Sequence, residues 1–241
     1  MQKKINLICL LFLLSISIAF GQTESVISKV SYESTPLSPS ILSLLKKQVP
    51  DPEQVNSVIA VLQKHKGYYS LYIDSKTHES LFVLDSLHSE PGVSSPGQIE
   101  FAYTNSDGEM IVKESFMKST IIIKDKLSTI EWNISDETKT VHERNCQNAT
   151  IKNGPDISVW FSSEISTNRG PGYFQGLFGL VFEANDFFST TYVTEVRNIE
   201  KSKVINELFE KYKQAPDGKV YSLQEFFLLK QNFIKTLKTE Q

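Results

Sequence analysis

Apolar side chains between Tyr68 and Thr194 recur mainly at every second position, the spacing of a strand with one buried face. Short runs of this kind are separated by turn-forming residues, and no helical pattern comes between them. A doubly wound nucleotide-binding fold needs a helix between successive strands, so the pattern excludes that fold class. It predicts one antiparallel sheet, either curved or forming an open barrel-like meander.

Most strands can be placed from this alternation and from the turns between them. The sequence predicts strands at 26–32, 68–73, 80–84, 99–103, 110–116, 119–123, 128–134, 177–183 and 189–199. Asn105-Ser106-Asp107-Gly108 is expected to join one antiparallel pair. The clearest hairpin signal is Asn153-Gly154, because Asn-Gly favours positive φ at both central turn positions. Its two arms are predicted at 138–152 and 155–162.

Helices are predicted before the sheet region. Ser38-Pro39 and Asp51-Pro52 each combine an N-cap residue with a proline at the first helical position. Apolar residues at helical spacing follow both signals. Pro50 separates the two helices, and Gly67 is expected to end the second.

Helices are also predicted after the sheet region. One is expected over 203–213, and the capping box Ser222-Leu223-Gln224-Glu225 opens another. The last helix has an apolar face, so it should pack on the sheet. The predicted fold class is therefore α+β, mainly β, with two N-terminal helices and one or two C-terminal helices.

Residues 1–21 have the pattern of a signal peptide. Two lysines precede an uncharged apolar run, which ends in the small-residue motif Ala19-Phe20-Gly21. We expect cleavage before Gln22, which leaves 22–241 as a single β-rich domain without a transmembrane segment. The protein should then reside in the periplasm, on the periplasmic side of the outer membrane, or outside the cell. A retained anchor and a lipoprotein modified at Cys9 are the alternatives.

Charge and cysteine content limit the partners. The net charge is -3 at pH 7, and loss of the two leader lysines would make the remainder more acidic. Such a balance disfavours nucleic acid or an anionic membrane as the main partner. Cys146 is the one cysteine beyond the predicted leader, so an intramolecular disulfide is excluded. A buried thiol is favoured, with a reactive thiol or an intermolecular bridge as the alternative.

Tests for catalytic, metal and cofactor motifs give no specific match. The glycines from Gly170 to Gly176 lack the spacing of a phosphate-binding loop, and no G-x-S-x-G motif occurs. The four histidines (His65, His78, His88 and His142) do not show metal-ligand spacing. Two acidic pairs, Glu183 with Asp186 and Asp156 with Glu164, stay open as acid–base groups. We therefore expect no cofactor, no metal and no enzymatic activity.

The segment from Asn168 to Glu183 combines glycines with aromatic residues. Core packing is one interpretation, and an apolar groove or partner surface is the other, because loops beside sheets often carry binding sites. The candidate surface for a ligand or partner consists of Trp160, Tyr173, Phe174, Leu177 and Phe178.

An ordered set of motifs carries a family resemblance. The motifs are Trp132…Glu137-Thr138-Lys139, Cys146-Gln147-Asn148-Ala149-Thr150, Val159-Trp160-Phe161 and Gly170-Pro171…Phe174-Gln175-Gly176-Leu177-Phe178-Gly179-Leu180-Val181. Together they resemble the GLPGLI family of secreted bacterial cell-envelope proteins. Phe178 stands where that family has proline, and Val181 where it has isoleucine. The signature residues carried over are Gly170, Pro171, Gly176 and Gly179.

The resemblance implies a secreted domain of unknown function, with no established active site to carry over. The leading hypothesis is an exported, non-enzymatic binding or assembly domain for an apolar ligand or an envelope partner. The alternative is a hydrolase or isomerase that uses Asp or Glu near the glycine-rich segment, which a convergent acidic pair lining a pocket would favour. A purely structural assembly component is the third hypothesis.

Overall fold

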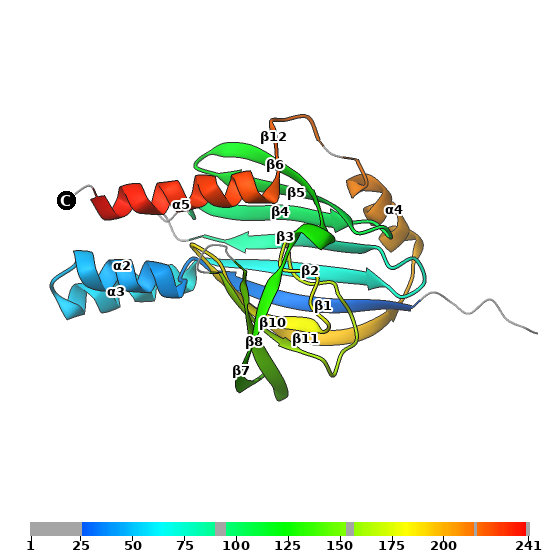
Figure 1. The fold of residues 1–241 in the computed structure, drawn as a ribbon, viewed down its shortest axis with the longest axis horizontal. Coiled ribbons are helices and arrows are strands. Elements are labelled where there is room, and N and C mark those ends of the chain that lie inside the picture. Colours follow the sequence, from blue (N-terminus) through cyan, green and yellow to red (C-terminus); the bar gives the residue numbers. More distant parts are fainter. Residues whose placement is uncertain (1–25, 90–94, 153–156, 215, 240–241) are drawn as a thin grey trace, which may run out of the picture.

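Figure 1 shows the computed structural model, which describes residues 26–89, 95–152, 157–214 and 216–239. Its strands form one open sheet in the order β12-β6-β5-β4-β3-β2-β1-β11-β10-β9-β8-β7. Neighbouring strands are antiparallel, except that β12 runs parallel to β6. The predicted class, α+β and mainly β with an open antiparallel sheet, is confirmed. The predicted leader, 1–21, lies outside the described residues.

The strands are β1 (Val26–Thr35), β2 (Lys66–Asp74), β3 (Ser80–His88), β4 (Gly97–Thr104), β5 (Glu109–Phe116), β6 (Ser119–Lys126), β7 (Trp132–Val141), β8 (Arg144–Ile151), β9 (Ser158–Ser162), β10 (Leu180–Asn185), β11 (Thr190–Glu200) and β12 (Val220–Tyr221). The predicted turn between β4 and β5 is present, and Gly108 adopts a φ of 79° there. A positive φ favours glycine because a Cβ atom would be strained in this conformation.

The predicted arm at 138–152 is wrong as a single strand. His142 and Glu143 form a tight turn with φ values of 48° and 62°, and β7 pairs with β8 across it. β8 then pairs with β9, as expected for the second arm. The Asn153-Gly154 turn itself lies outside the described residues.

The helices are α2 (Pro39–Gln48), α3 (Pro52–Lys64), α4 (Lys203–Tyr212) and α5 (Leu223–Thr239). Ser38 and Asp51 cap α2 and α3 through their side chains, which confirms both N-terminal signals. The Glu225 carboxylate accepts a hydrogen bond from the Ser222 backbone N–H, which confirms the capping box of α5. Gly67 does not end α3: the helix ends at Lys64, and Gly67 belongs to β2.

Both faces of the sheet are covered. Leu81 of β3 belongs to the core that includes Phe209 of α4, whereas Phe82 belongs to the core that includes Phe226 of α5. The two cores lie on opposite faces because successive side chains of a strand alternate. Figure 1 shows α5 lying along the part of the sheet formed by β4 to β6, with α2 and α3 beyond one end of the strands and α4 near the other.

Candidate functional site

A lysine lies in the middle of the buried face of α5. Phe226 and Ile234, one turn before and one turn after Lys230, are both buried, so helical spacing directs Lys230 into the core as well. The Lys230 side chain is fully buried. Buried lysines are rare unless a partner holds the ammonium group, so its surroundings are functionally informative.

Glu114 of β5 provides the first partner. Along β5 the side chains of Met110, Val112, Glu114 and Phe116 are buried in alternation, which places the Glu114 carboxylate among apolar neighbours. The Glu114 Oε1 atom lies 2.6 Å from Lys230 Nζ, and both side chains are 1% exposed. Gly97 permits this arrangement, because a Cβ atom there would lie 2.7 Å from Glu114 Oε1.

Asp186, in the turn between β10 and β11, provides the second partner. Its Oδ1 atom accepts hydrogen bonds from the backbone N–H groups of Phe188 (2.7 Å) and Ser189 (2.8 Å). Its Oδ2 atom lies 3.2 Å from Lys230 Nζ. The Tyr173 hydroxyl donates to Asp186 Oδ2 at 2.9 Å and accepts from Lys230 Nζ at 2.9 Å. These four side chains, Glu114, Tyr173, Asp186 and Lys230, form what we call the buried cluster.

Aromatic rings surround the lysine of the buried cluster. Lys230 Nζ lies 4.7 Å from the ring centroid of Phe226 and 5.3 Å from that of Tyr173. The rings of Phe187 and Phe188 are also within 6 Å, at 5.9 Å and 5.7 Å. The negative faces of aromatic rings attract a cation, so these rings help to keep the ammonium group charged without water.

The buried cluster contains two acids for one cation, and its pKa values follow from this imbalance. Burial raises the pKa of Glu114 to about 7, although Lys230 acts in the opposite direction. Burial would raise the pKa of Asp186 too, but Lys230 and the two backbone N–H donors outweigh it and lower that pKa. Likewise burial disfavours charge on Lys230, yet Asp186 and Glu114 raise its pKa. Glu114 is therefore the group of the cluster that titrates near neutral pH.

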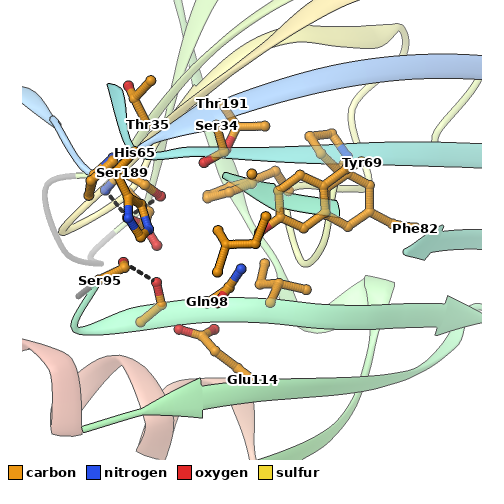
Figure 2. A pocket seen from close by; sticks show the side chains of 18 residues that line it. Ser34, Thr35, His65, Tyr69, Phe82, Ser95, Gln98, Glu114, Ser189 and Thr191 are labelled. Atoms are coloured by element: carbon orange, nitrogen blue, oxygen red, sulfur yellow. Dashed lines mark hydrogen bonds between the residues drawn. The ribbon is translucent and has the colours of Figure 1, made fainter. Parts of the chain in front are cut away.

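A cavity of about 40 Å³ adjoins the buried cluster. Glu114 and Asp186 line it together with residues from β1 to β4 and the glycine-rich segment, and Figure 2 shows Glu114 rising from β5 towards it. The Glu114 Oε2 atom is buried and has no hydrogen-bond partner. His65 Nδ1, in the same wall, is likewise buried and unpartnered. Burial and the nearby His88 lower the pKa of His65, which favours its neutral form.

Most of the candidate surface predicted from the sequence is buried. Tyr173, Phe174 and Leu177 are only 1%, 4% and 2% exposed, so these three do not form an exposed surface. They belong to the core that also contains strand residues and the buried phenylalanines of α5. Phe174 also lines the cavity beside Glu114. Trp160 is half-buried, with Lys139 Nζ 4.4 Å from its ring centroid.

Phe178, in contrast, is 85% exposed. We expect Phe178→Ala to change the free energy of unfolding by no more than about 0.5 kcal/mol, because surface substitutions outside special contacts are nearly neutral. Phe174→Ala should lower the melting temperature clearly, because it removes a buried ring. Thermal unfolding of the two variants checks this, and a large loss of stability in Phe178→Ala would show that its ring packs on the fold.

The signature glycines allow close backbone approach. A Cβ atom on Gly170 would lie 2.1 Å from the carbonyl oxygen of Phe174, and one on Gly179 would lie 2.4 Å from that of Ser162. Position 176 favours glycine for another reason: its φ is 89°, a conformation that side chains with a Cβ atom rarely adopt. Pro171 lines the cavity next to Phe174. Of the four signature residues, Pro171 is therefore the one that lines the cavity, and the glycines allow the local backbone conformation.

The acidic pair Glu183 with Asp186 is not observed, because each of the two carboxylates binds a different lysine, and the second pair cannot be assessed. Glu183 binds Lys139 at 2.8 Å and Glu164 binds Arg144 at 2.7 Å, while Asp156 lies outside the described residues. Asp186 instead converges with Glu114. Neither Glu114 nor Lys230 is identified as a candidate from the sequence. Glu114 and Lys230 nevertheless carry a detectable sequence signal, since each is a charged residue at an inward position of an apolar pattern. Such positions are rarely charged without a partner.

Cys146 is fully buried, as the sequence favoured, and burial raises the pKa of its thiol to about 11. Among the described residues, no helix is both long and apolar enough to cross a bilayer.

Residues 105–183 match the model of a family described as "Protein of unknown function (Porph_ging)". The match covers Glu114, Tyr173 and the glycine-rich segment but not Asp186 or Lys230. It supports a relation to a family of unknown function and does not confirm the resemblance to the GLPGLI family.

No protein with curated annotation matches the chain. Among solved structures, PNGF-II in its P21 and C2 crystal forms is 13% identical with a TM-score of 0.44. The alignment covers 88% of this chain but only 33% of PNGF-II, so the chain spans about a third of that protein's length. An uncharacterized conserved protein from Thermus thermophilus is 6% identical with a TM-score of 0.35, covering 81% of this chain and 90% of the other. These similarities are too weak to indicate a function.

Proposed function

We propose that this chain is an exported, non-enzymatic binding domain whose ligand or partner places a hydrogen-bond donor against Glu114. The observation that carries the proposal is the Glu114 side chain, which lines a cavity and whose buried Oε2 atom lacks a partner. A buried acceptor without a partner costs about 1–3 kcal/mol, and a bound donor group would remove that cost.

The charge of the buried cluster favours a donor over an acceptor. Glu114 Oε1 already binds Lys230 Nζ, and Lys230 also binds Asp186 and Tyr173. When all three charged groups are ionised, the cluster has one negative charge in excess. A primary ammonium group would balance this charge, and a hydroxyl group would supply the missing hydrogen bond.

The size of the cavity limits what enters it. A single water needs roughly 10–15 Å³ of such space, so about 40 Å³ accepts a few waters or one small terminal group. The rest of a larger ligand would remain outside, near the polar residues Ser34, Thr35 and Ser95 that also line the pocket. The ligand proposed here therefore presents a polar end, in contrast to the apolar ligand expected from the sequence. Export rests on the leader predicted at 1–21.

The proposal is tested with methylammonium and methanol, which match the two donor groups and fit the cavity. In ¹⁵N-resolved NMR titrations, both should shift the backbone amides of Gly67, Gly97 and Gln98, which line the cavity. Glu114→Gln should abolish the saturable response to methylammonium, because the charge is lost. Glu131→Gln, which alters an exposed carboxylate, should retain it. A response that is absent in the wild type, or equal in Glu114→Gln, would refute the proposal.

A hydrolase or isomerase is the second candidate. It is favoured by the convergence of Glu114 and Asp186 at one cavity and by the pKa of Glu114 of about 7, since a general acid–base group works best near the operating pH. A panel of p-nitrophenyl esters and glycosides provides a first assay. Turnover that Glu114→Gln removes and Glu131→Gln retains would establish catalysis and replace the binding proposal.

A further inference from the structure

Arg169 is a second buried charge. It belongs to the glycine-rich segment and precedes Pro171 in the sequence, whereas Tyr173 follows it. Arg169 is 4% exposed. Its Nε and Nη2 atoms donate to the carbonyl oxygen of His78 at 3.1 Å and 2.7 Å, and Nη2 also donates to that of Asn105 at 3.0 Å. Its Nη1 atom is buried and has no partner.

The charge of Arg169 is not compensated by any carboxylate that the structure describes. Burial lowers its pKa, but an arginine guanidinium remains protonated in proteins. Its two acceptors are neutral carbonyl groups, which satisfy hydrogen bonds without cancelling the charge. An uncompensated buried charge is costly, so an arrangement that retains one suggests that an anion completes it.

Arg169 lines a cavity of about 460 Å³ between the β1–β11 region and the loop that precedes the glycines. Two carboxylates, those of Asp74 and Glu164, line it too, but each has its own cation. Asp74 binds Lys201, and Glu164 binds Arg144 at 2.7 Å. With these charges matched, Arg169 is left as the unmatched positive charge of the cavity wall.

The remaining lining combines apolar and polar side chains, and the cavity suits a ligand of modest size. Ser166, Asn168 and Asn198 line the cavity beside Arg169. Sites for small organic molecules usually measure about 300–1,000 Å³ and contain a few convergent polar groups. This cavity fits that range, unlike the smaller one at Glu114.

We propose that this cavity binds a small organic anion whose carboxylate or phosphate group contacts the Arg169 guanidinium. Because Nε and Nη2 are engaged by carbonyl groups, the anion contacts the free Nη1 edge rather than both arms of the fork. The site is separate from the buried cluster and does not depend on the function proposed for Glu114.

The test uses acetate and inorganic phosphate as probes, with chloride at equal ionic strength as the reference. In NMR titrations one or both probes should shift the amides of Asn168, Arg169 and Ser75 in a saturable manner. Arg169→Gln should weaken binding by at least about tenfold, because it removes a charge-assisted hydrogen bond. Glu114→Gln should bind the probes as the wild type does. A response to acetate alone identifies a carboxylate site, and a response to phosphate alone identifies a phosphate site.

Arg169 also joins the His78 and Asn105 turns to the glycine-rich segment, so Arg169→Gln could unfold the protein. Ser166→Trp provides the second variant, since Ser166 is exposed and lines the cavity while the bonds of Arg169 stay intact. The indole should fill the cavity and abolish the response to the probes without a loss of folding. Unchanged binding in a folded Ser166→Trp, or no saturable response in the wild type, would overturn the proposal.

Discussion

Lys230→Met is expected to lower the free energy of unfolding by about 3–5 kcal/mol, the usual effect of removing one partner from a buried ion pair. The change leaves Glu114 and Asp186 facing each other in the core without a cation. It also removes the donor to the Tyr173 hydroxyl. Methionine fills a volume similar to that of lysine. The loss of unfolding free energy therefore reflects the missing charge rather than a cavity. Chemical denaturation with urea provides the measurement.

Lys152→Met is the matched control. Lys152 binds Glu131 at 2.8 Å, but both side chains are at least half exposed, so we expect a change of about 1 kcal/mol or less. Adding Glu114→Gln to Lys230→Met should restore part of the lost stability, because it removes the uncompensated carboxylate. Equal effects of the two lysine variants, or no recovery in the double variant, would contradict the ion-pair explanation.

The contribution of Glu114 to the stability of the wild type is expected to fall as the pH rises from about 4.5 to above 7. The folded-state pKa of Glu114 is about 7, above its ordinary value of 4.5, so the folded protein holds a proton that the unfolded chain has lost. The stability that Glu114 contributes therefore decreases with pH in this window. A shift of this size corresponds to roughly 3 kcal/mol.

The measurement is the difference in unfolding free energy between the wild type and Glu114→Gln at pH 5, 6, 7 and 8. The difference is needed because the lowered pKa of His65 acts in the opposite sense in the same window. The lowered pKa of Asp186 contributes stability that is lost only below its ordinary value of 3.8, outside this window. A difference that does not depend on pH would show that Glu114 remains ionised throughout.

Local signals in the sequence predict most of the elements. Ser38, Asp51 and Ser222 each satisfy backbone N–H groups at a helix start, and such caps depend on residues only two or three positions away. Gly108 marks its turn for the same reason, because a positive φ is a property of one residue. The turn at His142 and Glu143 is missed, since neither residue is a typical turn former and the flanking strands decide its conformation.

The candidate site is harder to predict because its parts come from distant segments. Glu114 and Lys230 each appear as one charged residue inside an apolar pattern, and neither pattern names the partner. The same limit explains why the sequence leaves both a core and a surface open for Tyr173, Phe174 and Leu177. Their aromatic and apolar character fits a core as well as a surface, whereas burial depends on where α5 packs.

The sequence by itself determined the class of fold, the helix starts and the glycines that a close backbone approach requires. Tertiary structure decided that β1 lies between β2 and β11, that Glu114 and Asp186 line one cavity, and that Lys230 binds both of them. The physical reason is the range of the interactions: caps, turns and alternation act within a few residues, whereas burial and charge pairing act between segments that only the folded chain brings together.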